Sequence, residues 1–171
     1  TEIVKLLLAR EDIMVNIKNE YKETPLHIAS SDGHTKIVEL LLTHPKIDVN
    51  VKNNLNETPL HRASSGGHTK IVELLLTHPK IDVDVQNNLN ETPLHIAVFY
   101  SNTEIVKLLL AREDIMVNIK NEYKETPLHI ASSDGHTKIV ELLLTHPKID
   151  VNVKNNLNET PLHRASSGGH T

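Results

Sequence analysis

One four-residue motif, Thr-Pro-Leu-His, recurs every 34 residues along this chain and constrains its fold more than any other feature. Its five copies begin at Thr24, Thr58, Thr92, Thr126 and Thr160. A fixed period of this length is typical of a solenoid, in which each repeat buries its apolar face only against its neighbours. We therefore expect one continuous array over residues 1–171. Its repeats are 1–34, which starts at a second helix, then 35–68, 69–102, 103–136 and 137–171.

A longer identity is superimposed on this period. Residues 1–69 reappear without one change as residues 103–171, a shift of 102 residues, which is three times 34. A block of three slightly different repeats has therefore been copied whole. Independent drift would have introduced substitutions, so the identity indicates either a very recent duplication or deliberate concatenation of repeats. The copy ends within a block, which favours an engineered or cut chain.

Composition excludes several classes of function. The formal net charge is −4, so there is no basic excess to attract nucleic acid or an anionic membrane. The chain has no cysteine, which excludes disulfides, thiolate metal sites and cysteine nucleophiles. Its apolar runs are much shorter than the roughly 20 residues of a membrane span, and its first residues do not have the form of a signal peptide. We expect a soluble protein that is cytoplasmic by default and needs no cofactor.

Residues 24–56 show how one repeat is predicted to fold. Thr24 and Pro25 are typical of the cap and the first position of a short helix, and Gly33 can supply the positive φ that ends it. Thr35 is expected to cap a second, more apolar helix that Pro45 terminates. The next residues, up to position 51, alternate apolar and polar side chains like an extended segment, and a turn then leads to the following motif.

These motifs resemble those of the ankyrin repeat family. Glu-Thr-Pro-Leu-His-x-Ala, Gly-His, Ile-Val-x-Leu-Leu and Asp-Val-Asn follow one another in the family's order, and the match covers the whole chain. The resemblance implies an all-α repeat solenoid, in which helix-turn-helix units with protruding hairpin loops stack into a curved superhelix. It also implies a non-catalytic role in binding other proteins on the concave side.

The sequence departs from the family pattern in its turns. The repeat period is 34 residues rather than about 33, so the loop after the second helix should bulge. Lys22 and Lys124 stand where the family has a turn glycine, and lysine tolerates left-handed geometry less well than asparagine. These two turns should therefore be strained or differently shaped. Ser101 replaces the glycine that ends the first helix and Asn102 the histidine after it, which makes the middle repeat the unusual one.

The twelve histidines fall in three periodic columns, which favours structural roles over metal binding. Neighbouring repeats must lie about 8–10 Å apart, whereas the ligands of one zinc ion sit roughly 2 Å from the metal, so no metal site is expected. In the resembled family the motif histidine braces its own turn and the next repeat. With the capping threonines, this role falls here to Thr24 and His27, Thr58 and His61, Thr92 and His95, Thr126 and His129, and Thr160 and His163. If these histidines are buried and neutral, acid should destabilise the array.

Partner contacts in the family come from the hairpin tips and from exposed positions late in the first helix. Here these positions hold the adjacent aromatic residues Phe99 and Tyr100 and the tip residues Tyr21 and Tyr123. Aromatic residues are frequent at binding hot spots, although the adjacent pair could instead fill space left by a different neighbour. Secondary candidates are the acidic residues Asp32 and Asp134, late in the first helix, and two arginines, Arg62 and Arg164. The other repeats have isoleucine at the arginine position, so each arginine must point outward or pair with a carboxylate.

The sequence leaves three functions open. The first is a scaffold that binds a protein partner of unknown identity. The second is a structural array that stacks head to tail with copies of itself, because the chain starts with a second helix and ends after a first one, leaving uncapped faces in register. An enzyme comes third, since the sequence contains no phosphate-binding glycine loop, His-Glu-x-x-His motif or Gly-x-Ser-x-Gly motif.

Overall fold

The computed structural model describes all 171 residues and contains ten helices and no strand. Pairs of short helices joined by a tight turn repeat along the chain, which confirms the all-α repeat solenoid expected from the sequence. The helices are α1 (Glu2–Leu8), α2 (Pro25–Ser31), α3 (Thr35–Leu42), α4 (Pro59–Gly66), α5 (Thr69–Leu76), α6 (Pro93–Phe99), α7 (Thr103–Leu110), α8 (Pro127–Ser133), α9 (Thr137–Leu144) and α10 (Pro161–Ser167).

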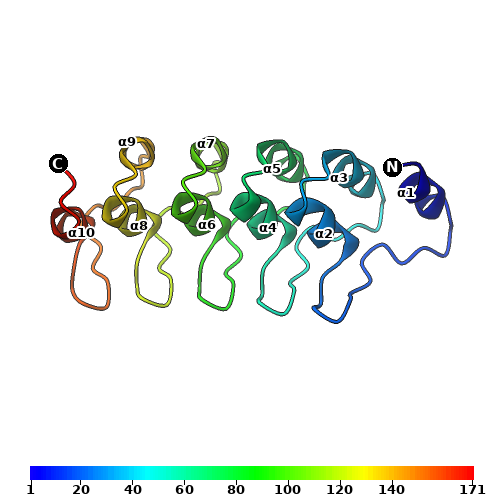
Figure 1. Cartoon of the computed structure of the whole chain (residues 1–171), viewed down its shortest axis with the longest axis horizontal. Coiled ribbons are helices and arrows are strands. Elements are labelled where there is room, and N and C mark those ends of the chain that lie inside the picture. Colours follow the sequence, from blue (N-terminus) through cyan, green and yellow to red (C-terminus); the bar gives the residue numbers. More distant parts are fainter.

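The helices form two rows (Figure 1). The first helices of the repeats, α2, α4, α6, α8 and α10, pack side by side in one row, and α1, α3, α5, α7 and α9 form the other. Long loops project from the first row, away from the second, and the two termini lie at opposite ends of the array. The rows bend into a shallow arch with the loops on its inner side (Figure 1). We call the surface shared by the first helices and these loops the inner surface.

Each first helix begins where the sequence predicts. Thr24 is the N-cap of α2 and Pro25 its first residue, and the His27 side chain bonds back to the Thr24 backbone to complete a capping box. The same box precedes α4, α6, α8 and α10. The expected cap of the second helix is wrong, because Thr35 is the first helical residue and His34 occupies the cap position without a side-chain bond. The turn between the two helices is so short that helical geometry already starts at Thr35.

The turns contain left-handed residues of several types. Gly67 has a φ of 69°, and Ser101 adopts 57° at the equivalent position. In the long loops, Lys22 and Lys124 have φ values of 59° and 58°, and the equivalent asparagines in the other repeats have 58° or 59°. The lysine turns therefore have the same shape as the asparagine turns, and what distinguishes them is the strain of a left-handed lysine.

The core consists of columns of equivalent residues, each covered by the next repeat. Leu26, Leu60 and Leu94 have no solvent-exposed surface. Leu162 occupies the same place in the last repeat but is 74% exposed. Burying a leucine side chain stabilises a fold by about 1.5–3 kcal/mol. Much of the stability of each repeat is therefore supplied by its neighbour.

Buried histidines connect each repeat to the next. The backbone N–H of Thr24 donates to His27 Nδ1 at 3.1 Å, and Nε2 of the same ring lies 3.0 Å from the backbone carbonyl of Glu57. Because Nδ1 accepts and a carbonyl can only accept, Nε2 carries the proton and the ring is neutral. His163 keeps its bond to Thr160, but no further repeat follows it in these 171 residues. The other three histidines make the same contact at 3.0–3.2 Å, His61 to Glu91, His95 to Glu125 and His129 to Glu159.

Burial explains why the rings of His27, His61 and His95 stay neutral. Loss of solvation lowers the pKa of His61 and of His95 from 6.5 to about 4, and it lowers the pKa of His27 as well. The hydrogen bond from Nε2 to the carbonyl favours the charged form but is outweighed by desolvation.

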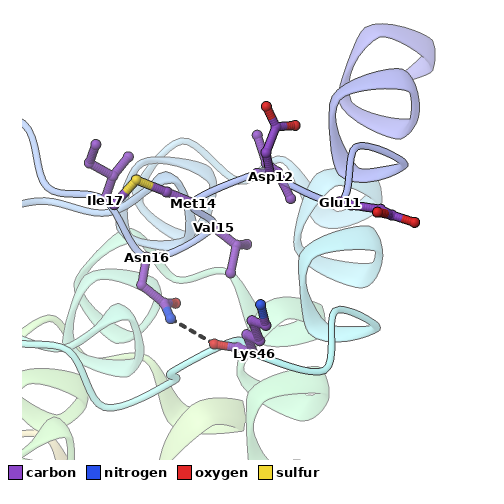
Figure 2. Close-up of a pocket in the computed structure, with 8 residues that line it drawn as sticks. Glu11, Asp12, Met14, Val15, Asn16, Ile17 and Lys46 are labelled. Carbon is purple, nitrogen blue, oxygen red and sulfur yellow. Dashed lines mark hydrogen bonds between the residues drawn. The ribbon is translucent and has the colours of Figure 1, made fainter.

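A second connection between repeats runs through an asparagine in the loop after the second helix of three repeats, and Figure 2 shows the first of these contacts. Asn16 Nδ2 donates to the backbone carbonyl of Lys46 at 2.7 Å, and its Oδ1 accepts from the backbone N–H of Asp48 at 2.9 Å. Asn50 and Asn118 make the same two bonds to the repeat that follows each of them. These residues form a ladder of paired hydrogen bonds.

Asp84 interrupts the asparagine ladder. Its carboxylate accepts from the backbone N–H of Met116 at 3.1 Å but has no N–H of its own to donate to a carbonyl of the next repeat. Burial raises the pKa of Asp84 to about 6, and the nearby carboxylates of Asp82 and Asp114 contribute in the same direction. The third and fourth repeats are therefore joined by one hydrogen bond fewer when Asp84 is ionised.

The buried histidines predict that acid destabilises the array. Histidines of the unfolded chain titrate near pH 6.5, whereas His61 and His95 titrate at about pH 4 in the folded chain. Between these values the unfolded state binds more protons, so the free energy of unfolding decreases as the pH falls, by up to about 1.4 kcal/mol per pH unit for each histidine. The melting temperature, followed by circular dichroism, should therefore decrease between about pH 6.5 and pH 4.5.

A matched control uses a solvent-exposed histidine. The variant His34→Gln removes an exposed ring that makes no side-chain cap bond, so its melting temperature should follow the wild-type pH curve. A wild-type melting temperature that stays constant from about pH 7.5 to pH 5 would contradict the prediction.

The ladder predicts that Asp84→Asn stabilises the array near neutral pH. The new amide can donate to the carbonyl of the following repeat as Asn50 Nδ2 does to Lys80, and a partly buried charge is removed. We expect a gain of about 1 kcal/mol in the free energy of unfolding at about pH 7.5, measured by urea denaturation. The folded pKa of Asp84 is raised, so the wild type recovers stability as the pH falls below about 6. The gain should therefore shrink at about pH 5.

The control for this substitution is Asp82→Asn, which changes an exposed neighbouring carboxylate whose oxygen accepts from the Asp84 backbone N–H. An asparagine keeps that acceptor, so little change in stability is expected. An Asp84→Asn variant no more stable than the wild type, or equally stabilised at both pH values, would show that the missing amide bond is not what limits this junction.

Candidate functional site

A stripe of exposed apolar side chains runs along the loop tips of the inner surface. It has one member per repeat, and each is between 46% and 72% exposed. The sequence reasoning singled out the two tyrosines and missed the three leucines. The signal that could have identified all five is their spacing, because each lies 34 residues after the one before it. We call this set the tip stripe: Tyr21, Leu55, Leu89, Tyr123 and Leu157.

Backbone hydrogen bonds hold the tip stripe in register. The carbonyl of Tyr21 accepts from the Asn54 N–H at 3.0 Å, and the carbonyl of Leu55 accepts from the Asn88 N–H at 2.9 Å. The same bond joins the remaining pairs of neighbouring loops. Within the first loop, the side-chain oxygen of Asn19 accepts from two backbone N–H groups at 2.9 Å and closes the turn. The exposed side chains are therefore carried on an ordered backbone rather than on independent loops.

Phe99 and Tyr100 lie at the end of α6, at the centre of the array. Their rings meet edge to face with centroids 5.1 Å apart, and the residues are 56% and 55% exposed. Together with Leu55, Leu89 and Ile96 they line a groove that we call the middle groove. Since more than half of each aromatic residue faces solvent, the pair does not serve to fill an internal space.

The acidic candidates lie away from the loop tips. Asp32 and Asp134 follow the last residues of α2 and α8, at the helix ends opposite the Thr-Pro-Leu-His caps. Their carboxylates lie 4.0 Å and 3.9 Å from Nε2 of His34 and His136. Neither aspartate lines the middle groove.

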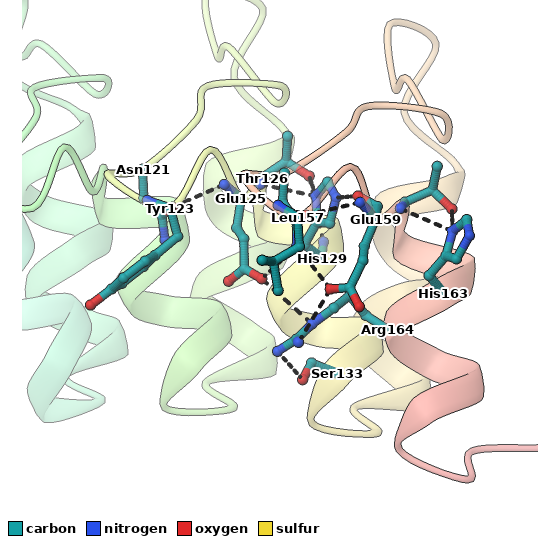
Figure 3. A network of polar contacts seen from close by, with 12 residues as sticks. Asn121, Tyr123, Glu125, Thr126, His129, Ser133, Leu157, Glu159, His163 and Arg164 are labelled. Carbon is teal, nitrogen blue, oxygen red and sulfur yellow. Dashed lines mark hydrogen bonds and ion pairs between the residues drawn. The ribbon is translucent and has the colours of Figure 1, made fainter.

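The two arginine candidates pair with carboxylates, which is one of the two arrangements expected for them. Figure 3 shows the Arg164 guanidinium reaching between Glu125 and Glu159. Its Nε and Nη1 lie 3.5 Å and 3.6 Å from these carboxylates, and its Nη2 donates to Ser133 Oγ at 3.0 Å. Arg62 repeats part of the arrangement, with one carboxylate, Glu57, at 3.4 Å and the hydroxyl of the serine that ends α2 at 3.0 Å. Both arginines are thus engaged within the chain.

The two ends of the array expose apolar side chains that are buried elsewhere. Ile3 in α1 is 73% exposed, whereas the equivalent Ile71 and Ile105 have no exposed surface. At the other end, Leu162 is 74% exposed, whereas the equivalent Leu60 and Leu94 have no exposed surface. These side chains show what a repeat presents where no neighbour packs against it.

No three or more histidine, aspartate or glutamate side chains are grouped so that they could hold a metal ion. Among the ten helices, none combines the length and the hydropathy that crossing a membrane requires.

The comparison with known families agrees with this architecture. The family model described as ankyrin repeats (3 copies) matches residues 1–53, 45–121, 79–155 and 115–171, four overlapping segments that together span the chain. No curated protein matches the sequence. With helix pairs, protruding loops and family matches all following the same 34-residue period, the chain belongs to the ankyrin repeat family.

Proposed function

We propose that this chain is a non-catalytic scaffold that binds another protein through its inner surface. Ankyrin repeats generally mediate protein–protein interactions and are typically not catalytic. The observation that supports the proposal most directly is the exposure of Phe99 and Tyr100 beside the tip stripe. Exposed aromatic and apolar residues on an ordered surface are typical of interfaces.

The arrangement of the surface favours an elongated binding segment. Neighbouring repeats are separated by about 8–10 Å, so the members of the tip stripe form a row with that spacing. A protein segment lying along the row can place successive apolar side chains against successive repeats. Because hydrogen bonds already fix the loops, little conformational entropy of the scaffold has to be lost on binding.

A selection from a displayed library of random peptides tests this proposal. Peptides are selected on the wild-type chain, and their affinities are then measured for the double variant Phe99→Ala/Tyr100→Ala. We expect affinity to fall about tenfold or more, because two anchors of the interface are removed. Both side chains are more than half exposed, so the variant should keep the wild-type melting temperature.

The matched control is Lys36→Ala/Glu39→Ala, which changes two exposed residues of α3 in the second row of helices. It should leave peptide affinity unchanged. Peptides that bind the aromatic variant as tightly as the wild type, or lose affinity on the α3 control, would place the interface elsewhere and refute the proposal.

We propose head-to-tail association as a second candidate function, favoured by the exposed apolar side chains at the two ends. The α10 sequence is a copy of the corresponding part of α4, and α4 packs against α5. The α1 helix carries the same Ile-Val and Leu-Leu-Leu positions as α5. The α1 helix of one chain can therefore pack against α10 of another as α5 packs against α4, and a contact of this kind does not close.

Light scattering behind size exclusion tests association of these 171 residues. The molar mass should rise above 19.2 kDa as the concentration increases over about a hundredfold range, and Leu162→Glu should abolish the increase. The control Tyr100→Ala changes an exposed residue at the centre of the array and should not affect it. A mass that stays at 19.2 kDa at all concentrations would rule out this candidate.

A further inference from the structure

A column of half-buried glutamates lies along the inner surface, directly before the capping threonines. The members are Glu23, Glu57, Glu91, Glu125 and Glu159. Three of them pair with an arginine of their own or the following repeat, Glu57 with Arg62, and both Glu125 and Glu159 with Arg164.

Glu91 differs from the other four glutamates. Its own repeat and the following one carry Ile96 and Ile130 at the arginine position, whereas each of the other glutamates has an arginine in one of these two repeats. The Glu91 carboxylate accepts from Asn87 Nδ2 at 3.1 Å and has no ion pair. Glu91 is therefore a carboxylate without an arginine partner, whereas the equivalent glutamates of the two neighbouring repeats are paired with arginines.

The Arg164 site shows which groups hold a guanidinium on this surface. They are the serine hydroxyl near the end of the preceding first helix and the glutamates of the two adjoining repeats (Figure 3). The equivalent positions two repeats earlier in the chain are 68 residues lower in number. Ser133, Glu125 and Glu159 correspond there to Ser65, Glu57 and Glu91, and the position of Arg164 is held by Ile96.

All three of these equivalent groups line the middle groove. Ser65, Glu57 and Glu91 border it together with Ile96. Arg62 also lines the groove and neutralises Glu57 at 3.4 Å, so Glu91 is the carboxylate without an ion pair. Ile96 is 8% exposed, so it packs where the aliphatic stem of an arginine would lie and is too short to reach the carboxylates. The Ser65 hydroxyl donates to the backbone carbonyl of Arg62 at 3.0 Å and keeps its capacity to accept.

The aromatic pair adds a second element suited to a guanidinium. Phe99 and Tyr100 follow Ile96 by three and four residues on the short α6 segment, so all three side chains project from the same face. A guanidinium is planar and weakly hydrated, and it stacks on aromatic rings while its N–H groups bond to carboxylates. Leu55 and Leu89 provide apolar surface on the opposite, loop side of the groove.

We propose that the middle groove binds an arginine side chain of the protein partner, with the guanidinium held by Glu91 and Ser65 against the aromatic pair, while Glu57 stays paired with Arg62. The partner segment thereby supplies in trans what Arg62 and Arg164 supply within the chain. Apolar residues beside that arginine contact Leu55 and Leu89. This inference rests on the proposed function and specifies the chemistry of the partner.

The test uses a defined probe, the peptide acetyl-Gly-Leu-Arg-Leu-Gly-amide, and its counterpart with citrulline in place of arginine. Citrulline has nearly the same shape without the charge. Backbone amide shifts of the isotope-labelled full chain are followed by NMR during titration. We expect saturable shifts at residues 65, 91, 99 and 100 with a dissociation constant in the millimolar range, and binding about tenfold weaker or more for the citrulline peptide.

Variants fix the site of binding. Ile96→Arg introduces the residue that Arg62 and Arg164 already accommodate at this position, so it should fold and compete internally with the probe. Both Ile96→Arg and Glu91→Gln should weaken the arginine peptide about fivefold or more. The control Glu39→Gln makes the same charge change at an exposed position of α3 and should have no effect.

Each other outcome is decisive. Equal binding of the two peptides at the middle groove would overturn the arginine site and leave the proposed interface intact. Shifts confined to other residues, no saturation up to about 20 mM peptide, or affinity unaffected by Ile96→Arg would also overturn the arginine site. Failure of the interface itself is recognised separately, by library-selected peptides that do not respond to Phe99→Ala/Tyr100→Ala.

Discussion

The inner surface depends on the hydrogen bond from each buried histidine to the backbone of the next repeat. His61 donates to the carbonyl of Glu91, and the side chain of the same glutamate lines the middle groove. The loop that ends at Glu91 also carries Leu89 at its tip. One bond thus positions a carboxylate and an apolar side chain of the proposed binding surface. Because burial keeps the ring neutral, the same bond links the geometry of this surface to pH.

Local structure follows from local sequence, whereas burial does not. The duplicated segments make this visible, because Lys22 and Lys124 have φ values of 59° and 58° in the same turn. Yet Leu60 is fully buried and its copy Leu162 is 74% exposed, and Ile3 and its copy Ile105 differ almost as much. Identical residues adopt the same backbone geometry, but their solvent exposure depends on whether another repeat packs against them. This is what nearest-neighbour stabilisation in a solenoid means at the level of single side chains.

The features predictable from the sequence were those encoded within one repeat. The period, the Thr24 capping box and the left-handed glycines depend on residues close in the chain, and so does the alternation after Pro45. The prediction of Thr35 as a helix cap was wrong because residue types alone do not give the length of the preceding turn.

The candidate site was predicted only in part, because its contacts join different repeats. The aromatic residues were identified by type, but the leucines of the tip stripe become a surface only when five loops are aligned. The pairing of Arg164 with Glu125 crosses 39 positions of the chain, the difference between 164 and 125, so no local pattern reveals it.

The middle repeat combines two kinds of departure, and the structure treats them differently. Asn102 replaces a histidine, yet its Nδ2 donates to the Ser64 carbonyl at 2.7 Å much as His68 Nε2 contacts the Ser31 carbonyl at 2.9 Å. Ser101 likewise adopts the left-handed geometry of the glycine that it replaces. These substitutions preserve the junction between repeats.

On the inner surface, by contrast, no other residue of the chain restores the contacts that the substituted positions make in the other repeats. The aromatic pair stands where other repeats have serine and glycine or aspartate, and Glu91 has no arginine in its own or the following repeat. A repeat that keeps its junctions and changes its exposed face retains the shape of the array while altering what that face can bind. The central position places this face between repeats on both sides, where the neighbouring loops can contribute to the proposed interface.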